Sequence, residues 1–392
     1  MNKRSVRDLD AQGKRVLVRV DFNVPVKDGE VTDDTRIRRA LPTIQHLLSE
    51  GARPALISHL GRPKGEPDPK YAMGPVAKRL EELLRGPVTK LDAATGPEVG
   101  NALAASDGGV VLLENSRYYP GETKNDAGFA EELAEPFDLY VNDAFGAAHR
   151  AHATTGGVAE RLPSAAGLLM EAEIDYLDGV LSDPERPFVA ILGGAKVSDK
   201  LGVIESLLGV ADSLLIGGAM CFTFFKAKGY EIGDSLVEDD YLQEARRLMD
   251  EAGGRLVLPA DVVVAGAMEE GAETQTVPVD SIPPGKMGLD IGPESVGAFR
   301  GTVSEARTIF WNGPMGVFEI DAFAKGTEGV AKAVAEASGG GATSVIGGGD
   351  SVAAVNKRGL DDRMSHISTG GGASLEYVEG KELPGVAVLP DK

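Results

Sequence analysis

The chain has 392 residues, of which 42% are hydrophobic, and a formal net charge of −20. This length exceeds one ordinary hydrophobic core, so we expect two domains. The negative charge argues against nucleic acid or an anionic membrane as a partner, and it means that an anionic substrate needs a local cluster of basic residues.

The sequence shows no targeting or membrane segment. Its first ten residues, MNKRSVRDLD, are charged and contain no apolar core of a signal peptide. No apolar run approaches the roughly 18 residues that span a membrane. The single cysteine, Cys221, excludes an internal disulfide, fits a reducing cytosol and is interpreted as a small buried side chain. We therefore expect a cytoplasmic protein.

The N-terminal region begins with a predicted strand at residues 15–20, RVLVRV, because β-branched residues dominate it. Pro25 ends regular pairing shortly afterwards. Asp21 and Asn23 therefore follow the carboxyl end of a strand, which is where open α/β sheets bind ligands.

A helix is predicted next, within residues 33–51. Its apolar spacing is amphipathic, its N-cap candidates are Asp33, Asp34 and Thr35, and Gly51 ends it. Arg36 lies in the first turn, where the helix dipole favours acids. A cation there indicates a nearby anion, with a solvated, exposed arginine as the alternative. On this basis, replacing Arg36 by alanine should leave Tm unchanged or slightly higher.

Further apolar runs are each followed by polar residues and a helix pattern, the βαβ signature of a parallel sheet. The side chains after these strands include His59, Arg62, Glu114, Asn115, Arg117, Asn142 and Asp143. Gathered at one sheet edge, five arginines would form a basic cluster suited to phosphate and carboxylate. These are Arg19, Arg36, Arg62, Arg117 and Arg150. Without a third orienting group, His149 and His152 are interpreted as anion contacts or structural residues.

A helix over about residues 168–181 is the predicted domain connector, and DPERP ends it. A second α/β half follows, with strand FVAILGG and helix LGVIESLLGV, for which Ser198 is an N-cap candidate. Lys196 and Lys200 flank this helix start, again against the dipole preference. More strands are predicted in SLLIGGAM, RLVLPADVVVA and TIFWNG, whereas residues 269–295 are expected to be rich in loops. Trp311 is favoured as a core residue over a base-stacking one.

Two glycine triplets, Gly347–Gly349 and Gly370–Gly372, each lie between a predicted strand and a predicted helix. Glycine lacks a Cβ, so backbone N–H groups can approach a ligand, and the helix adds its positive N-terminal end. Such turns bind anions, most often phosphate. One triplet alone could be a tight cap or loop, but two in succession predict two anionic groups brought together.

Several common motifs are absent, namely GxxxxGK[ST], GxGxxG, HExxH and GxSxG. Two anion-binding halves favour phosphoryl transfer, which depends on positioning, cations and magnesium rather than on a covalent group of the protein. Asp350 directly follows the first glycine triplet and is the candidate to hold Mg²⁺ on nucleotide phosphates.

Nine segments spanning nearly the whole chain resemble, in order, the motifs of the phosphoglycerate kinase family. They are RVDFNVP, SHLGRP, ENSRYYPGE, NDAFGAAHRAH, GGAKVSDK, GGAM with TF, WNGPMGVFE, GGGDS and STGGGASLE. Serine at position 351 and methionine at position 315 are small departures that leave the chemistry intact.

The resemblance implies an α/β fold with two doubly wound, Rossmann-like parallel-sheet domains that face a cleft and are joined by a connecting helix. Residues 1–167 would bind phosphoglycerate, 168–185 form the hinge, 186–377 bind Mg-nucleotide and 378–392 return to the N-terminal domain. The implied reaction converts 1,3-bisphosphoglycerate and ADP reversibly into 3-phosphoglycerate and ATP, by in-line transfer on domain closure. We expect a monomer.

The resemblance also assigns residues to sites. The acid-substrate site would contain Asp21, Asn23, Arg36, His59, Arg62, Arg117 and Arg150. The nucleotide site would contain Lys200, Gly288, Glu319, Gly347, Gly348, Gly349, Ser351 and Asp350, the last holding Mg²⁺. The groups around the transferring phosphoryl would be Arg36, Lys196, Lys200 and the amides of Gly371 and Gly372.

Two alternatives belong to other classes. A catalytically silent homologue would typically have lost a cation or the metal-binding aspartate, yet all of these residues are present. A different acid kinase would explain a carboxylate substrate but not the ordered motifs.

Overall fold

The computed structural model describes residues 2–106 and 108–392 of the chain. The chain forms two compact units: the N-terminal unit contains Met1–Asp175 with Glu382–Lys392, and the C-terminal unit contains Tyr176–Lys381. The boundary between the units falls within helix α5 (Leu168–Ser182), which covers the predicted connector helix. Over the part of the chain that is described, no helix is both long enough and apolar enough to cross a membrane.

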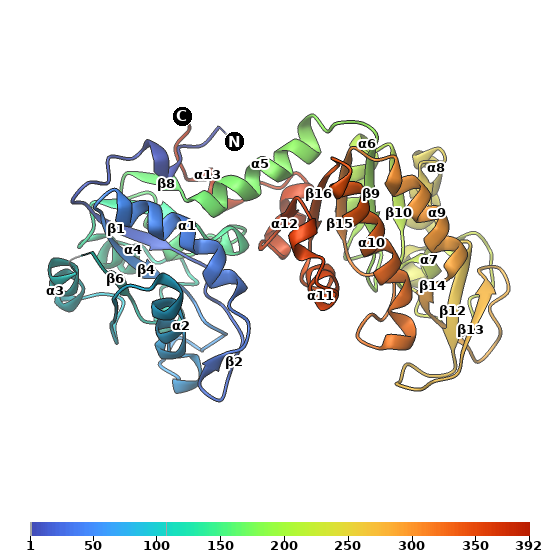
Figure 1. Cartoon of the computed structure of the whole chain (residues 1–392), viewed down its shortest axis with the longest axis horizontal. Coiled ribbons are helices and arrows are strands. Elements are labelled where there is room, and N and C mark those ends of the chain that lie inside the picture. Colours follow the sequence, from blue (N-terminus) through green and yellow to red (C-terminus); the bar gives the residue numbers. More distant parts are fainter. Residues whose placement is uncertain (1, 107) are drawn as a thin grey trace. The chain divides into compact units, whose positions relative to one another are not determined.

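A parallel sheet forms the centre of the N-terminal unit (Figure 1). Its strands are β1 (Arg15–Arg19), β4 (Arg53–Ile57), β5 (Val88–Lys90), β6 (Val110–Leu112), β7 (Leu139–Asn142) and β8 (Ser164–Ala166). They lie in the order β5-β6-β4-β1-β7-β8, and a separate hairpin pairs β2 (Val26–Lys27) with β3 (Glu30–Val31). The chain adds β4 on one side of β1 and later β7 on the other, which creates the reversal point of a doubly wound sheet.

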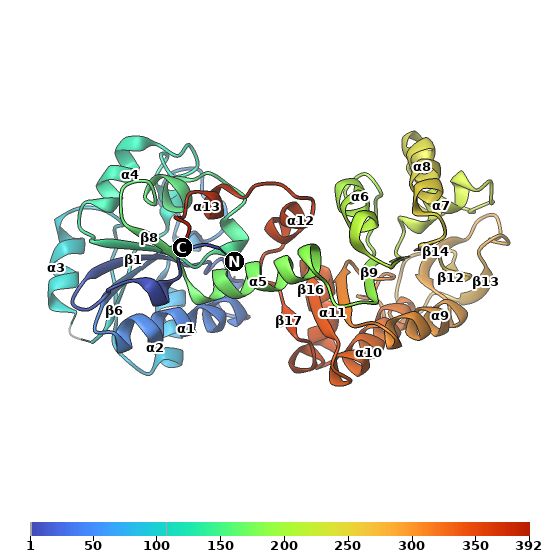
Figure 2. The ribbon, with the colours of Figure 1, turned by 90° about the horizontal axis from the view of Figure 1, so that it is seen from above.

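Helices cover both faces of this sheet. The α-helices are α1 (Thr35–Ser49), α2 (Gly74–Leu84), α3 (Pro97–Ala105), α4 (Ala127–Ala134) and α13 (Pro384–Ala387). Shorter helical turns are η1 (Val6–Asp8), η2 (Pro69–Tyr71), η3 (Ser116–Tyr118), η4 (Phe145–Ala147) and η5 (Ala153–Gly157). Helices α1 and α2 lie on one face and α4 on the other (Figure 2). In α1 the buried residues Ile37, Ile44 and Leu47 recur at helical spacing, so one stripe of the helix joins the core.

The last residues of the chain belong to the N-terminal unit. Lys3 forms an isolated antiparallel bridge with Asp391, and the Nζ of Lys3 lies 2.9 Å from a carboxylate oxygen of Asp391. At the end of β7, the side-chain amide of Asn142 donates to the carbonyl of Gly385 at 2.9 Å. These contacts fix α13 to the unit that contains the N-terminus.

The C-terminal unit contains a second parallel sheet. Its strands are β9 (Phe188–Leu192), β10 (Ser213–Ile216), β11 (Leu256–Val257), β15 (Thr308–Asn312), β16 (Thr343–Gly347) and β17 (His366–Ile367). They lie in the order β11-β10-β9-β15-β16-β17, so the chain again builds outward from one strand in both directions. The predicted α/β class with two doubly wound parallel sheets is confirmed.

The helices of the C-terminal unit also form two layers. They are α6 (Leu201–Val210), α7 (Cys221–Ala227), α8 (Leu242–Ala252), α9 (Pro293–Ser304), α10 (Lys325–Gly339), α11 (Gly349–Lys357) and α12 (Gly372–Val378), with turns η6 (Asp239–Tyr241), η7 (Asp321–Phe323) and η8 (Asp361–Arg363). Figure 2 shows α6 and α8 on one side of the sheet and α9 and α10 on the other. The core between the sheet and α9–α10 includes fully buried Trp311, whose Nε1 donates to Gly313 O at 2.8 Å. The predictions that Trp311 and Cys221 are buried are confirmed.

Residues 269–295 are rich in loops, as predicted, but they also contain two strands that were not predicted. β13 (Thr274–Pro278) and β14 (Met287–Ile291) pair in antiparallel fashion with β12 (Asp261–Ala265). The run RLVLPADVVVA is also divided, with β11 in the main sheet and β12 in this small one. In β13 only Val277 is buried, so the strand carries almost no hydrophobic signal.

Ser198 is not the N-cap of α6. That position is occupied by Lys200, whose side chain makes no capping bond, while the Ser198 hydroxyl donates to Glu238 Oε1 at 2.6 Å. The Ser198 hydroxyl therefore bonds to Glu238, which is distant in sequence, and not to the backbone at the start of α6 as the local pattern predicted.

Candidate active site

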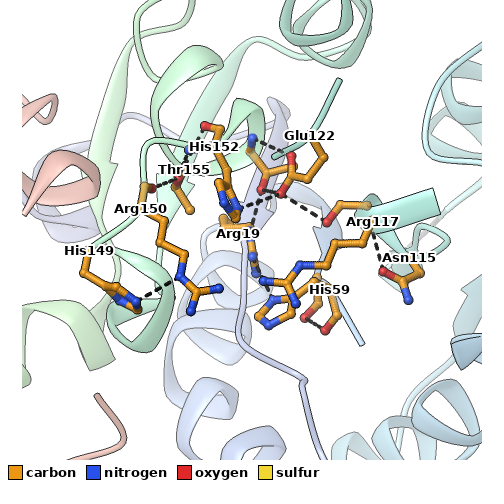
Figure 3. Close-up of polar contacts among 12 residues, drawn as sticks. Arg19, His59, Asn115, Arg117, Glu122, His149, Arg150, His152 and Thr155 are labelled. Carbon is orange, nitrogen blue, oxygen red and sulfur yellow. Dashed lines mark hydrogen bonds and ion pairs between the residues drawn. The ribbon is translucent and has the colours of Figure 1, made fainter. Parts of the chain in front are cut away.

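The predicted acid-substrate residues follow the carboxyl ends of neighbouring strands in the N-terminal unit. Asp21 and Asn23 follow β1, His59 and Arg62 follow β4, Arg117 lies in η3 after β6, and Arg150 lies beyond β7. The sheet order brings these strand ends to one edge. Figure 3 shows the guanidinium groups of Arg117 and Arg150 turned toward the region that contains the His59 ring.

Arg36 pairs with Asp21. Its NH1 group donates to Asp21 Oδ2 at 2.8 Å, and Asp21 is 8% exposed. Burial favours the protonated form of Asp21, but His59, Arg36 and Arg19 together bring its pKa below the ordinary value. The anion that the unusual helix start indicated is thus present within the chain, and the alternative of a solvated arginine is wrong.

Asn23 and Arg117 hold the loop that carries Arg62. The Asn23 side-chain oxygen accepts from Gly61 N at 2.8 Å, and Arg117 NH1 donates to Gly61 O at 2.7 Å. Gly61 has a φ of +64°, and a Cβ there would lie 2.2 Å from the Tyr71 ring, so the turn requires glycine. Arg62 itself is exposed next to this fixed turn. Burial lowers the pKa of Arg117, and Arg150 and Arg19 lower it further, as expected among neighbouring cations.

Arg19 lies beneath this surface rather than on it. It is fully buried, and its Nε donates to the Thr154 hydroxyl at 2.8 Å. The Thr154 hydroxyl in turn donates to Glu122 Oε1 at 2.5 Å, and Ser116 Oγ donates to the same oxygen at 3.2 Å. Thr154 and Glu122 were not predicted from the sequence to belong to the site. Glu122 is the last residue of the segment ENSRYYPGE, and Thr154 belongs to the pair of threonines that follows His152. These positions were the only sequence signals for the two residues.

Of the two histidines, His152 lacks the setting of a general acid at neutral pH. His149 Nε2 accepts from Arg150 Nε at 3.0 Å. Burial lowers the pKa of His152 to about 4, with Arg117, Arg19 and Arg150 adding to the effect. Their interpretation as anion contacts or structural residues therefore stays preferred.

In the C-terminal unit, both predicted strand–glycine–helix turns are present. Gly347 ends β16, Gly348 has a φ of +84°, and α11 begins at Gly349 with Asp350 exposed in its first turn. A Cβ on Gly348 would lie 2.8 Å from Asn312 Nδ2, so close packing as well as the backbone requires glycine. In the second turn, Gly371 has a φ of +52° and α12 begins at Gly372.

Lys200 reaches the first of these two glycine turns through Asn312. Its amine donates to Asn312 Oδ1, while the buried Asn312 Nδ2 makes no hydrogen bond among the described residues. Burial lowers the pKa of Lys200, and Asp199, Asp350 and Glu379 partly oppose that effect. Lys196 is exposed in the loop before α6. Asn312 was not predicted from the sequence, although it ends β15 as Asn142 ends β7.

A pocket of about 730 Å³ in the C-terminal unit brings together Gly288, Glu319 and Asp350. A Cβ on Gly288 would lie 2.0 Å from the Phe222 ring, so the close approach of this ring requires glycine at position 288. Apolar residues line much of the rest: Cys221, Phe222, Leu236, Met268, Met287, Leu289, Met315 and Val317. Ser351 is fully buried, and its hydroxyl accepts from Gly313 N at 2.5 Å, so it fixes the neighbouring loop.

Comparisons with known proteins agree with this geometry. The profile of the family described as Phosphoglycerate kinase matches residues 6–381. A phosphoglycerate kinase from Rubrobacter xylanophilus is 79% identical over 392 residues, covering 100% of this chain and 99% of that protein, and one from Thermosipho africanus is 56% identical with the same coverages. The solved structure of phosphoglycerate kinase from Coxiella burnetii gives a TM-score of 0.89 at 40% identity, covering 98% of each chain. The solved structure of phosphoglycerate kinase from Pyrococcus horikoshii gives a TM-score of 0.84 at 34% sequence identity, and the match also covers 98% of each chain.

Proposed function

The chain belongs to the phosphoglycerate kinase family and has phosphoglycerate kinase activity, and from this premise we propose how its residues divide the reaction. The N-terminal unit binds 3-phosphoglycerate or 1,3-bisphosphoglycerate through Asp21, Asn23, Arg36, His59, Arg62, Arg117 and Arg150. The C-terminal unit binds the nucleotide in the pocket that contains Gly288, Glu319 and Asp350. One observation carries this division: each unit has its own set of groups suited to an anion, at the strand ends of its own sheet.

The transfer itself forms one P–O bond and breaks another. A β-phosphate oxygen of ADP attacks the acyl phosphorus, and the carboxylate of 3-phosphoglycerate leaves with the electron pair of the broken bond. Charge in the transition state is spread over the transferring phosphoryl oxygens. Arg36, Lys196 and the amides of Gly371 and Gly372 surround this group, while Lys200, positioned by Asn312, contacts a nucleotide phosphate.

Magnesium fits the donor set at the start of α11. The family uses magnesium nucleotide, and Mg²⁺ is usually held through one or two carboxylates plus substrate phosphates. Asp350 supplies one exposed carboxylate beside the glycine turn. When bound, Mg²⁺ neutralises phosphate charge and orients the nucleotide. The amides of Gly347–Gly349 and the N-terminus of α11 lie next to that carboxylate and suit the phosphates.

We further propose that the enzyme acts as a monomer in the cytoplasm and that the two units approach each other during transfer. A single buried cysteine fits a reducing compartment. The approach follows from the division of the site, because groups on two units can surround one phosphoryl only when the units meet.

A coupled assay tests the proposed division. With 3-phosphoglycerate, MgATP and hydroxylamine, the wild type is expected to form the trapped hydroxamate only when both substrates are present. Arg62→Ala should raise the KM for 3-phosphoglycerate about tenfold to a hundredfold and leave the KM for MgATP nearly unchanged. Glu319→Ala should do the reverse. Equal changes of both KM values in either variant would contradict two separate binding sets.

A further inference from the structure

His59 is held by a group that can only donate hydrogen bonds. It follows β4, is 7% exposed, and its Nδ1 lies 3.0 Å from Arg19 NH2. A guanidinium has no acceptor, so Nδ1 of His59 must accept this bond. A neutral imidazole with Nδ1 as acceptor carries its proton on Nε2.

Arg19 is itself fixed in this orientation. Its Nε donates to Thr154 Oγ1 at 2.8 Å, and its NH1 donates to Val20 O. Thr154 uses its own proton on Glu122 Oε1 at 2.5 Å, and its backbone N–H donates to Glu122 Oε2 at 3.0 Å. Nε, NH1 and NH2 of Arg19 therefore each have one defined acceptor, and the hydrogen bonds run from Arg19 outward to both Thr154 and His59.

Burial and the neighbouring cations both disfavour protonation of the His59 ring. Burial is the largest influence and lowers its pKa well below the ordinary value. Asp21, in the loop after β1, raises the pKa, whereas Arg19 of β1, Arg117 of η3 and Arg36 of α1 lower it. One carboxylate, that of Asp21, thus raises the pKa of His59, whereas cations on three elements lower it.

We propose that Arg19 is a positioning residue that holds His59 as the neutral Nε2–H tautomer, so that Nε2 offers a fixed hydrogen-bond donor to the acidic substrate. This inference rests on the proposed role of His59 as a substrate contact. A neutral donor recognises the substrate without an ion pair to Asp21 competing for the ring. Arg19 acts through His59 and does not itself touch the substrate.

Nuclear magnetic resonance of the full chain labelled with ¹⁵N-histidine tests the tautomer directly. The chain has five histidines, and His59→Gln identifies the signals of His59 by their loss. From about pH 6 to about pH 8, Nδ1 of His59 is expected to resonate as an unprotonated nitrogen and Nε2 as a protonated one. Addition of 3-phosphoglycerate should shift the Nε2 signal. A protonated Nδ1 in the wild type, or an Nε2 signal that 3-phosphoglycerate does not move, would overturn the proposal.

Variants test the role of Arg19. Arg19→Met should give a mixture of His59 tautomers and raise the KM for 3-phosphoglycerate about tenfold, with kcat and the KM for MgATP changed by less than about threefold. Thr154→Val leaves Arg19 in place but removes its Nε acceptor, and should shift the tautomer in the same direction even if Arg19→Met does not fold. Arg15→Met, on the same strand, is the matched control and should leave the His59 signals unchanged. Unchanged tautomer and KM in both Arg19→Met and Thr154→Val would overturn the positioning role.

The failure of this inference can be separated from failure of the proposed function. If the wild type forms hydroxamate from 3-phosphoglycerate and MgATP but its His59 carries the proton on Nδ1, only the tautomer assignment is wrong. If no hydroxamate forms, the proposed function fails whatever the state of His59.

Discussion

Replacing Arg36 by alanine is expected to lower kcat by a factor on the order of 10² to 10⁵, with a much smaller change in the KM for either substrate. The reason is that Arg36, in the proposed arrangement, meets the phosphoryl charge chiefly in the transition state, and loss of such an interaction lowers kcat rather than ground-state binding. Arg39→Ala, an exposed arginine of the same helix, is the matched control and should retain wild-type kcat.

Lys196→Ala is expected to give a loss of similar size. In the proposed arrangement Arg36 and Lys196 act on one group, so the double variant should lose much less than the product of the two single losses. Steady-state kinetics of the four proteins measures this coupling. Fully multiplicative losses would show that the two side chains act independently, and the proposed arrangement around the phosphoryl group would be wrong.

The ion pair with Asp21 changes the expected effect of Arg36→Ala on stability. From its helix position alone, the variant should be as stable as the wild type or slightly more so. Because Arg36 pairs with an almost fully buried carboxylate, we now expect the variant to lose about 1–2 kcal/mol of unfolding free energy. Arg36→Lys keeps a cation beside Asp21, so it should recover most of this stability but little of kcat. A loss of activity that only follows the unfolded fraction would make Arg36 structural.

Asp350→Asn is expected to have the second large effect. It should lower kcat/KM for MgADP by a factor on the order of 10² or more while leaving the Kd of 3-phosphoglycerate nearly unchanged. The carboxylate would act only on the ion that accompanies the nucleotide, so excess Mg²⁺ should recover part of the loss. Calorimetric titration with each ligand, together with initial rates at several Mg²⁺ concentrations, measures these effects.

The matched control for Asp350 is Asp361→Asn, an exposed aspartate of the same unit, which should bind both ligands as the wild type does. Equal weakening of 3-phosphoglycerate and MgADP binding by Asp350→Asn would instead indicate a structural role for this residue.

The sequence predicted those parts of the site that depend on local pattern. Asp21 and His59 directly follow apolar strands, and the glycine triplets lie between a strand and a helix, so short segments contain the whole signal. Arg36 and Lys200 stood out because each opposes a local preference of its helix start.

The partners of these residues could not be predicted, because tertiary contacts select them. Lys200 and Asn312 are 112 residues apart, and Arg19 and Thr154 are 135 apart. Nothing in the neighbourhood of Arg19 marks it as buried, since two of its acceptors, Thr154 of η5 and His59 after β4, are distant in sequence. In the same way, β13 and β14 were missed because they are short strands among glycine and proline residues, and pairing with β12 rather than their own composition defines them.

The central claim, that groups on the two units meet around one phosphoryl, is tested most directly by small-angle X-ray scattering. The measurement compares the radius of gyration of the wild type without ligands, with 3-phosphoglycerate alone, with MgATP alone, and with both at saturation. We predict a clear decrease with both ligands, since only then does the enclosed phosphoryl group stabilise the closed state. An unchanged radius in samples shown to turn over under the same conditions would contradict closure and the shared role of Arg36 and Lys196.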